Sequence, residues 1–155
     1  MRGGLQSVPF ELLQERWNEY IFSDQVVVRT RLILIAVMQE RELGPLTFQT
    51  ERATTVSAPE YLRGSPGKHE QGNEEDEGVK WECPILLRYE RWNDYSLADG
   101  TKRLRIIFVA KTAFKLMNAF DNNGQPIYII DGKPLIKVDN RICQDEIETD
   151  LGIES

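Results

Sequence analysis

The sequence predicts an all-β protein in which a tandem duplication of a roughly four-stranded unit forms one barrel or sandwich with pseudo-twofold symmetry. The first reason is an internal repeat: residues 15–20 read Glu-Arg-Trp-Asn-Glu-Tyr, and residues 90–95 read Glu-Arg-Trp-Asn-Asp-Tyr. The second is a series of β-branched and aromatic runs punctuated by Gly, Pro, Asn and Asp. The third is size, because a unit of about 50 residues buries too little surface to be stable alone, so we expect the units to share one core.

The match between the two copies extends beyond this motif at a constant offset of 75 residues. Pro9 aligns with Pro84, and Asp24 aligns with Asp99. Similarity at a fixed spacing is the signature of duplicated structural units. The chain divides into a first β repeat (1–63), a flexible acidic linker (64–79), a second β repeat (80–141) and an acidic C-terminal tail (142–155).

Two stretches define the expected strands most clearly. The run from Val26 to Met38 is so rich in Val, Ile and Leu that we expect a central strand, with its second half buried on both faces. In the second copy, Asp99-Gly100 lies between two strand-like segments and predicts a two-residue hairpin turn. That turn places Tyr95 opposite Leu104.

Later turns define the rest of the second copy. The Asn-rich stretch 121–124 is expected to close one hairpin, and Asp131-Gly132 to close the next. The segment 111–120 could form a helical turn, but its alignment with the first copy favours a strand extension.

The net charge of −6 is unevenly distributed along the chain. Residues 60–82 carry −4 and residues 139–155 carry −5, whereas residues 83–138 carry +4. Residues 64–78 contain no aliphatic or aromatic side chain, so this stretch cannot bury enough surface to order itself. The acidity therefore belongs to the linker and the tail.

The residues needed for catalysis are sparse. The one histidine, His69, lies in the linker, and the two cysteines, Cys83 and Cys143, have no metal-binding or redox spacing. Cys83 aligns with Val8, which indicates a small buried hydrophobic residue. No phosphate-binding loop, dinucleotide fingerprint or zinc motif occurs. We expect a protein that is not an enzyme and that uses neither a cofactor nor a metal.

The repeated motif has two interpretations. It could form two equivalent contact patches, since Trp, Tyr and Arg dominate interaction hot spots. It could instead be structural, with the Trp and Tyr side chains filling the core and Asn18 and Asn93 fixing a turn, which we favour because packing is the commonest requirement of both copies. The candidate binding residues are Arg16, Trp17, Tyr20, Arg91, Trp92 and Tyr95.

Single-stranded nucleic acid is the specific alternative to a protein partner. Lys102, Arg103 and Arg105 lie on one predicted hairpin near Trp92, and a basic sheet with aromatic side chains is typical of single-strand binders. The sequence pI of about 4.9 opposes phosphate binding, unless the acidic tail covers the hairpin in the free protein. We therefore expect a binding or assembly module that acts through protein–protein contacts or self-association.

The motif, together with Leu97, Asp99, Gly100 and Gly124, resembles a group of small uncharacterised prokaryotic proteins, many of them archaeal, with a Trp-Asn-x-Tyr-x-Leu-x-Asp-Gly pattern. The resemblance covers the second copy and, more weakly, the first, and it implies a microbial origin but no activity. The sequence has no apolar run of membrane-spanning length and no secretory start, so we expect no membrane association and a cytoplasmic location.

Overall fold

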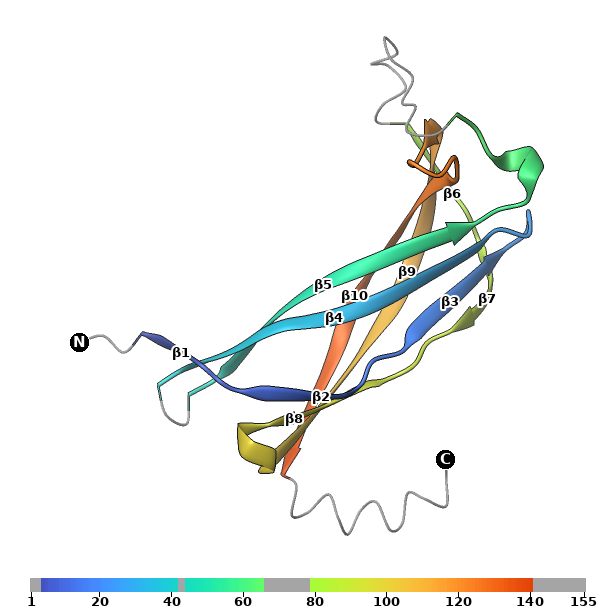
Figure 1. The fold of residues 1–155 in the computed structure, drawn as a ribbon. Coiled ribbons are helices and arrows are strands. Elements are labelled where there is room, and N and C mark those ends of the chain that lie inside the picture. The colour runs from blue at the N-terminus through green and yellow to red at the C-terminus, as the bar shows by residue number, and fades with distance from the viewer. Residues whose placement is uncertain (1–3, 42–43, 66–78, 141–155) are drawn as a thin grey trace, which may run out of the picture.

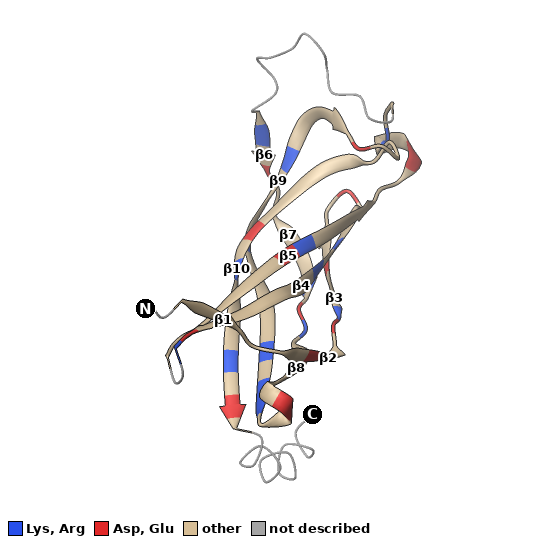
Figure 2. Cartoon of the chain, turned by 60° about the vertical axis from the view of Figure 1, so that its left-hand side comes forward, with Lys and Arg blue, Asp and Glu red and all other residues tan. Residues whose placement is uncertain are grey.

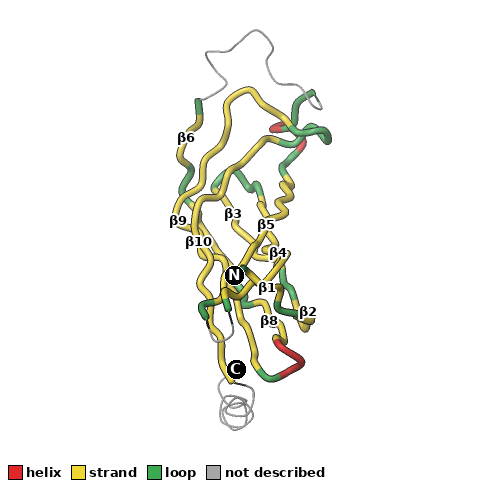
Figure 3. Tube along the Cα trace, turned by 90° about the vertical axis from the view of Figure 1, so that its left-hand side faces the viewer, coloured by secondary structure: helices red, strands yellow, loops and turns green. Residues whose placement is uncertain are grey.

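A computed structural model of the chain describes residues 4–41, 44–65 and 79–140. Within these ranges the chain is almost entirely β-strand, with two short 3-10 helices and no α-helix (Figure 3). The all-β prediction is confirmed. The elements are β1 (Leu5–Ser7), β2 (Phe10–Gln14), β3 (Trp17–Phe22), β4 (Val27–Glu40), β5 (Leu46–Ser57), η1 (Glu60–Leu62), β6 (Lys80–Glu82), β7 (Ile85–Tyr89), β8 (Asn93–Leu97), η2 (Ala98–Gly100), β9 (Lys102–Phe120) and β10 (Pro126–Asn140).

The strands form two antiparallel sheets of five strands each. In the first sheet β5 pairs with one edge of β4, while β3 and β1 pair with opposite ends of its other edge. In the second sheet β10, β8 and β6 are arranged in the same way around β9. Figure 1 shows the long strands of one sheet crossing those of the other.

Each sheet is completed by a strand from the other half of the sequence. β2 pairs with β8, and β7 pairs with β3. The short connections at residues 15–16 and 90–92 carry the chain from one sheet to the other. The halves are therefore linked through backbone hydrogen bonds as well as through side-chain packing.

One hydrophobic core lies between the sheets and draws on both halves of the chain. Tyr20 and Val28 from the first half, and Tyr95 and Leu104 from the second, are no more than 1% exposed. In the described part of the chain each sheet keeps three outer strands that pair on one side only, β1, β5 and β7 in the first sheet and β2, β6 and β10 in the second. The molecule is thus a pair of packed open sheets and does not close into a barrel.

Several local predictions are confirmed. Tyr95 lies opposite Leu104, the register that the Asp99-Gly100 turn predicts. Both turn residues have positive φ, which glycine adopts without strain. Residues 111–120 continue β9 as a strand, and the turn at 121–124 joins β9 to β10.

The predicted hairpin turn at Asp131-Gly132 is wrong. β10 runs unbroken through these residues, and they form an irregularity in its pairing with β9. A Cβ atom on Gly132 would lie 2.1 Å from the carbonyl oxygen of Val109 and 2.8 Å from Cα of Ala110. The glycine is therefore needed for close approach of two backbones and not for reversal of the chain.

Two further expectations need correction. The second half of β4 is not buried on both faces, because Ile35 is 43% exposed on the outer face of a sheet that is covered on one side only. Each half contributes five strands, because β1 and β6 are short strands that the sequence pattern did not distinguish. Most of the linker (residues 66–78 of 64–79) and all of the tail (142–155) lie outside the described residues.

Candidate functional site

The repeated motif lies beside the central strands β4 and β9, where each lacks a neighbouring strand along part of one edge. β8 pairs with residues 102–106 of β9 and β6 with residues 114–116, which leaves residues 107–113 without a strand on that edge. Residues 32–37 of β4 have the same gap between β3 and β1. Buried backbone N–H and C=O groups need partners, so side chains must supply them here.

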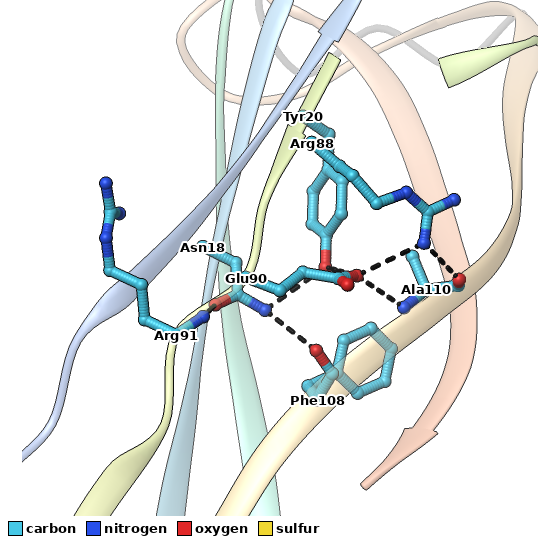
Figure 4. Close-up of polar contacts among 7 residues, drawn as sticks. All are labelled: Asn18, Tyr20, Arg88, Glu90, Arg91, Phe108 and Ala110. Atoms are coloured by element: carbon cyan, nitrogen blue, oxygen red, sulfur yellow. Dashed lines mark hydrogen bonds and ion pairs between the residues drawn. The ribbon is translucent and has the colours of Figure 1, made fainter. Parts of the chain in front are cut away.

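Asn18 supplies partners in the gap of β9 (Figure 4). Its Nδ2 donates to the carbonyl oxygen of Phe108 at 3.0 Å and to the Tyr20 hydroxyl at 3.1 Å. Its Oδ1 accepts from the backbone N–H of Arg91 at 2.9 Å. One buried amide thus joins three segments that are distant in the sequence.

Asn93 makes the corresponding contacts in the gap of β4. Its Nδ2 donates to the carbonyl oxygen of Leu32 at 2.9 Å, and its Oδ1 accepts from the backbone N–H of Arg16 at 2.8 Å. Arg16 and Arg91 form a second pair of matching contacts between the halves. Arg16 donates to the carbonyl oxygen of Trp92, and Arg91 donates to that of Trp17, each at 2.8 Å.

Glu90 completes the network around β9. Its carboxylate accepts from the Tyr20 hydroxyl at 2.9 Å and from the backbone N–H of Ala110 at 2.7 Å, as Figure 4 shows. Arg88 donates to the same carboxylate at 3.4 Å and to the carbonyl oxygen of Ala110 at 2.8 Å. The mostly buried carboxylate is therefore satisfied by one cation and two neutral donors.

Glu15 has the equivalent place in the first half. Its carboxylate accepts from the Tyr95 hydroxyl at 2.7 Å and from Arg31 at 3.2 Å, and its side chain is 7% exposed. Burial, followed by the hydrogen bond to the carboxylate, raises the pKa of Tyr20 and of Tyr95 above the usual tyrosine value. Both tyrosines therefore stay protonated as hydrogen-bond donors at neutral pH.

The tryptophans of the motif are not in the core. Asn18 and Tyr20 take the inner face of β3, so Trp17 lies on the outer face, where it is half-buried and 5.9 Å from the Arg31 guanidinium. Trp92, also half-buried, is 5.9 Å from Arg105. The expectation that both Trp and Tyr fill the core is wrong for Trp17 and Trp92 and confirmed for the two tyrosines.

The basic hairpin carries cations that already have acidic partners. Arg103 donates to Asp94 at 2.9 Å, and Arg105 lies 3.4 Å from Asp139. Lys102 is half-buried at the start of β9. Basic and acidic positions lie side by side at this end of the second sheet (Figure 2). The arrangement brings the three predicted cations together but offsets much of their charge.

Metal ligands and nucleophilic side chains are the groups most often used in catalysis. No group of three or more His, Cys, Asp or Glu side chains in the described part of the chain could hold a metal ion. Cys83 is half-buried against the core, as its alignment with Val8 predicts, and burial raises the pKa of its thiol. This shift is opposite to that of a reactive thiolate. His69 and Cys143 lie outside the described residues.

Sequence reasoning missed Glu15 and Glu90 as members of this network. The available signal was their presence in both copies, immediately before the Arg-Trp-Asn core of the motif. Aromatic and basic residues are the usual residues of interfaces, so the motif pointed to them. A carboxylate is rarely buried unless it is paired, so burial of the two glutamates was not expected. Only the contact across 70 residues or more identifies the partners.

None of the helices in the described ranges is long and apolar enough to cross a membrane. The chain matches no protein-family model, and no curated protein and no solved structure is significantly similar to it.

Proposed function

We propose that this protein is a non-enzymatic binding or assembly module that makes protein–protein contacts through the outer strands of its two sheets. The observation that carries the proposal is the location of its exposed apolar side chains. Within the described ranges twelve large apolar side chains are well exposed, and eight of them lie on the outer strands β2, β7 and β10. Exposed apolar groups gathered at sheet edges are typical of sites that receive another chain. The eight are Leu12, Leu13, Leu86, Leu87, Tyr89, Leu135, Ile136 and Val138.

The strand β7 offers the densest of these surfaces. Leu86 is 58% exposed, Leu87 51% and Tyr89 45%. The ladder pairs Leu87 with Ile21 and Tyr89 with Glu19, so both side chains lie on the outer face of the first sheet. An extended segment added beside β7 would hydrogen-bond to its free backbone groups and cover these side chains.

We infer that the chain is a tandem duplication whose two copies exchange β2 and β7 about a pseudo-twofold axis. The matching strand orders of the two sheets support this inference. The reciprocal contacts support it further, because Asn18 bonds to Phe108 while Asn93 bonds to Leu32. Exchange explains why the motif is retained in both copies: each copy satisfies the backbone of the other.

A nucleic-acid function has less support. Two of the three cations of the basic hairpin, Arg103 and Arg105, are paired with carboxylates, and the net charge of the chain is −6. Non-specific nucleic-acid affinity comes mostly from unneutralised cations that displace counterions from phosphates. The half-buried Trp92 beside Arg105 is the one feature in its favour, since bases stack on aromatic rings.

The test compares two probes on the intact chain. The probes are a library of random twelve-residue peptides and an unlabelled oligonucleotide pool, each titrated at low and high salt. We expect peptides rich in apolar and β-branched residues to bind with weak salt dependence, and Leu87→Lys to reduce their affinity at least about tenfold. Ile35→Lys, which changes a residue of comparable exposure (43%) on the inner strand β4, is the matched control.

Two outcomes would overturn the proposal. One is tight oligonucleotide binding that falls steeply with salt and is lost in the Lys102→Glu, Arg105→Glu double variant. The other is a catalytic turnover that disappears when Cys83 or His69 is replaced by alanine.

A further inference from the structure

The long outer strands of the two sheets, β5 and β10, differ in how their free edges are protected. β10 carries Pro134, two lysines at 133 and 137, and a pairing irregularity at residues 131–132. These are the devices by which proteins prevent unwanted strand pairing. β5 contains no proline, lysine or glycine in twelve residues, and its two charges, Glu51 and Arg52, are opposite in sign.

The difference holds at equivalent positions of the two ladders. Arg29 on β4 pairs with Glu19 of β3 and with Thr55 of β5. Arg105 on β9 pairs with Asp94 of β8 and with Lys137 of β10. Thr55 therefore stands where the second half has a lysine. By the same comparison, Arg52 is at the position equivalent to Pro134, and Glu51 is at the position equivalent to Lys133.

We propose that a second copy of this chain pairs with the free edge of β5, antiparallel and about a twofold axis at Ala53. The inference rests on the proposed function, since it assumes that outer strands make protein contacts, but it assigns a different strand and names the occupant. β5 pairs only with β4 among the described elements, so its other edge has free N–H and C=O groups. An unprotected strand edge of this length tends to pair with another chain in a soluble protein. A second copy of the same chain is always available for that pairing.

The sequence of β5 fits pairing with itself in this register. Centred on Ala53, Glu51 faces Thr55 of the second copy, and Arg52 faces Thr54. Thr50 then faces Val56, a favourable pair of β-branched side chains. Centring on residue 51 or 52 would bring two like charges together, which disfavours those registers.

The charges around β5 also fit this register. Glu51 has no ion pair among the described residues. Arg29, on the strand next to Thr55, pairs with Glu19 at 2.9 Å, but its side chain is still 55% exposed. In the dimer, Glu51 of one copy therefore lies one strand away from Arg29 of the other.

Protection of β10 determines the size of the assembly. If both long edges were open, copies could pair β5 with β10 and continue as a filament, whereas pairing of one edge with itself closes after two copies. Because the edge of β10 is protected and only β5 can pair, we expect a closed dimer. The arrangement joins the two first sheets into one continuous sheet and leaves β7 and β2 free for other partners.

The experiment is analytical ultracentrifugation of the intact chain with a charge exchange on β5. We expect a concentration-dependent dimer for the unmodified chain. Thr55→Glu places a second carboxylate opposite Glu51 and is expected to weaken the dimer at least tenfold, whereas the Glu51→Lys, Thr55→Glu double variant restores attraction and the dimer. Both sites are exposed, and circular dichroism checks that each variant folds.

Leu135→Lys on β10 is the matched control, because it adds a charge to the edge that the proposal leaves unused, and it should leave the dimer unchanged. A chain that stays monomeric at millimolar concentration overturns the inference, as does a dimer that Leu135→Lys weakens and Thr55→Glu does not. Peptide binding lost in Leu87→Lys tests the proposed function separately. A monomer that still binds those peptides refutes the dimer alone, and a monomer that binds no peptide refutes both.

Discussion

At the junction between the two halves of the chain, the contacts of one half match those of the other. At the outer edges of the sheets, the two halves differ. At the junction Asn18 and Asn93, like Glu15 and Glu90, make corresponding contacts in both copies. At the long outer edges β5 and β10 differ in charge, proline content and regularity. Side chains that complete the backbone of the opposite half are the same in both halves, while side chains at the outer edges differ between the halves.

The same comparison separates two kinds of aromatic residue within one motif. Tyr20 and Tyr95 are buried and donate to carboxylates from the opposite half of the chain. Trp17 and Trp92 lie half-buried, each beside an arginine. The tyrosines therefore belong to the shared junction, and the tryptophans are the aromatic residues of the motif that remain partly accessible.

The largest expected effect is the loss of a junction tyrosine. Tyr20→Ala or Tyr95→Ala removes a fully buried ring and one of the hydrogen-bond donors to a buried carboxylate, so each should cost about 3–5 kcal/mol of unfolding free energy. Trp17→Ala should cost less, about 1–2 kcal/mol, because the ring is half-buried and its arginine contact is worth little. Urea denaturation measures all three, and a Trp17→Ala loss as large as that of Tyr20→Ala would contradict the distinction.

Next in size is the loss of a junction amide. Asn18→Ala leaves the carbonyl oxygen of Phe108 and the N–H of Arg91 without partners, which should cost about 2–3 kcal/mol. Asn93→Ala should cost the same to within about 0.5 kcal/mol, because its contacts correspond. Asn123→Ala, in an exposed turn, serves as the control and should change the melting temperature little. Unequal losses of unfolding free energy for Asn18→Ala and Asn93→Ala would contradict the equivalence of the two halves.

The raised tyrosine pKa values predict a loss of stability in alkali. Tyr20 and Tyr95 keep their protons in the folded state, whereas the unfolded chain loses them above a pH of about 10. Their contribution is fully present below that pH, and stability then falls by about 1.4 kcal/mol per pH unit for each tyrosine as the pH rises toward the folded-state pKa. Tyr20→Phe should reduce this slope by the contribution of one tyrosine, because it removes one titrating hydroxyl. Urea titrations between pH 8 and about 11 measure the slope.

The smallest expected effect is a gain in stability at a position where the halves differ. Thr30 is 1% exposed, and its hydroxyl has no hydrogen-bond partner among the described residues. The equivalent residue, opposite Asn93 on β9, is the apolar Ile106. Thr30→Val should therefore raise the unfolding free energy by about 1 kcal/mol, and Ile106→Thr should lower it. A destabilising Thr30→Val would mean that the hydroxyl does have a partner in solution.

The sequence by itself determined the features that depend on local chemistry. The alternation and β-branched content of the chain predicted an all-β protein, and the Asp99-Gly100 turn predicted the pairing of Tyr95 with Leu104. The turn at 121–124 followed in the same way, whereas the strand at 111–120 was predicted from its alignment with the first copy. These predictions succeeded because turn chemistry and side-chain alternation act over a few residues.

Only the tertiary structure decided which strands pair across the two halves and which side chains are buried. Nothing local to β3 indicates that Asn18 bonds to a backbone carbonyl 90 residues away, or that the aromatic ring facing outward is Trp17. The same holds for Gly132, whose role depends on the close approach of Val109. Strand exchange, burial and backbone approach are set by the free energy of satisfying distant polar groups and packing one common core. That free energy depends on which distant segments meet, and no local pattern in the sequence records the pairing.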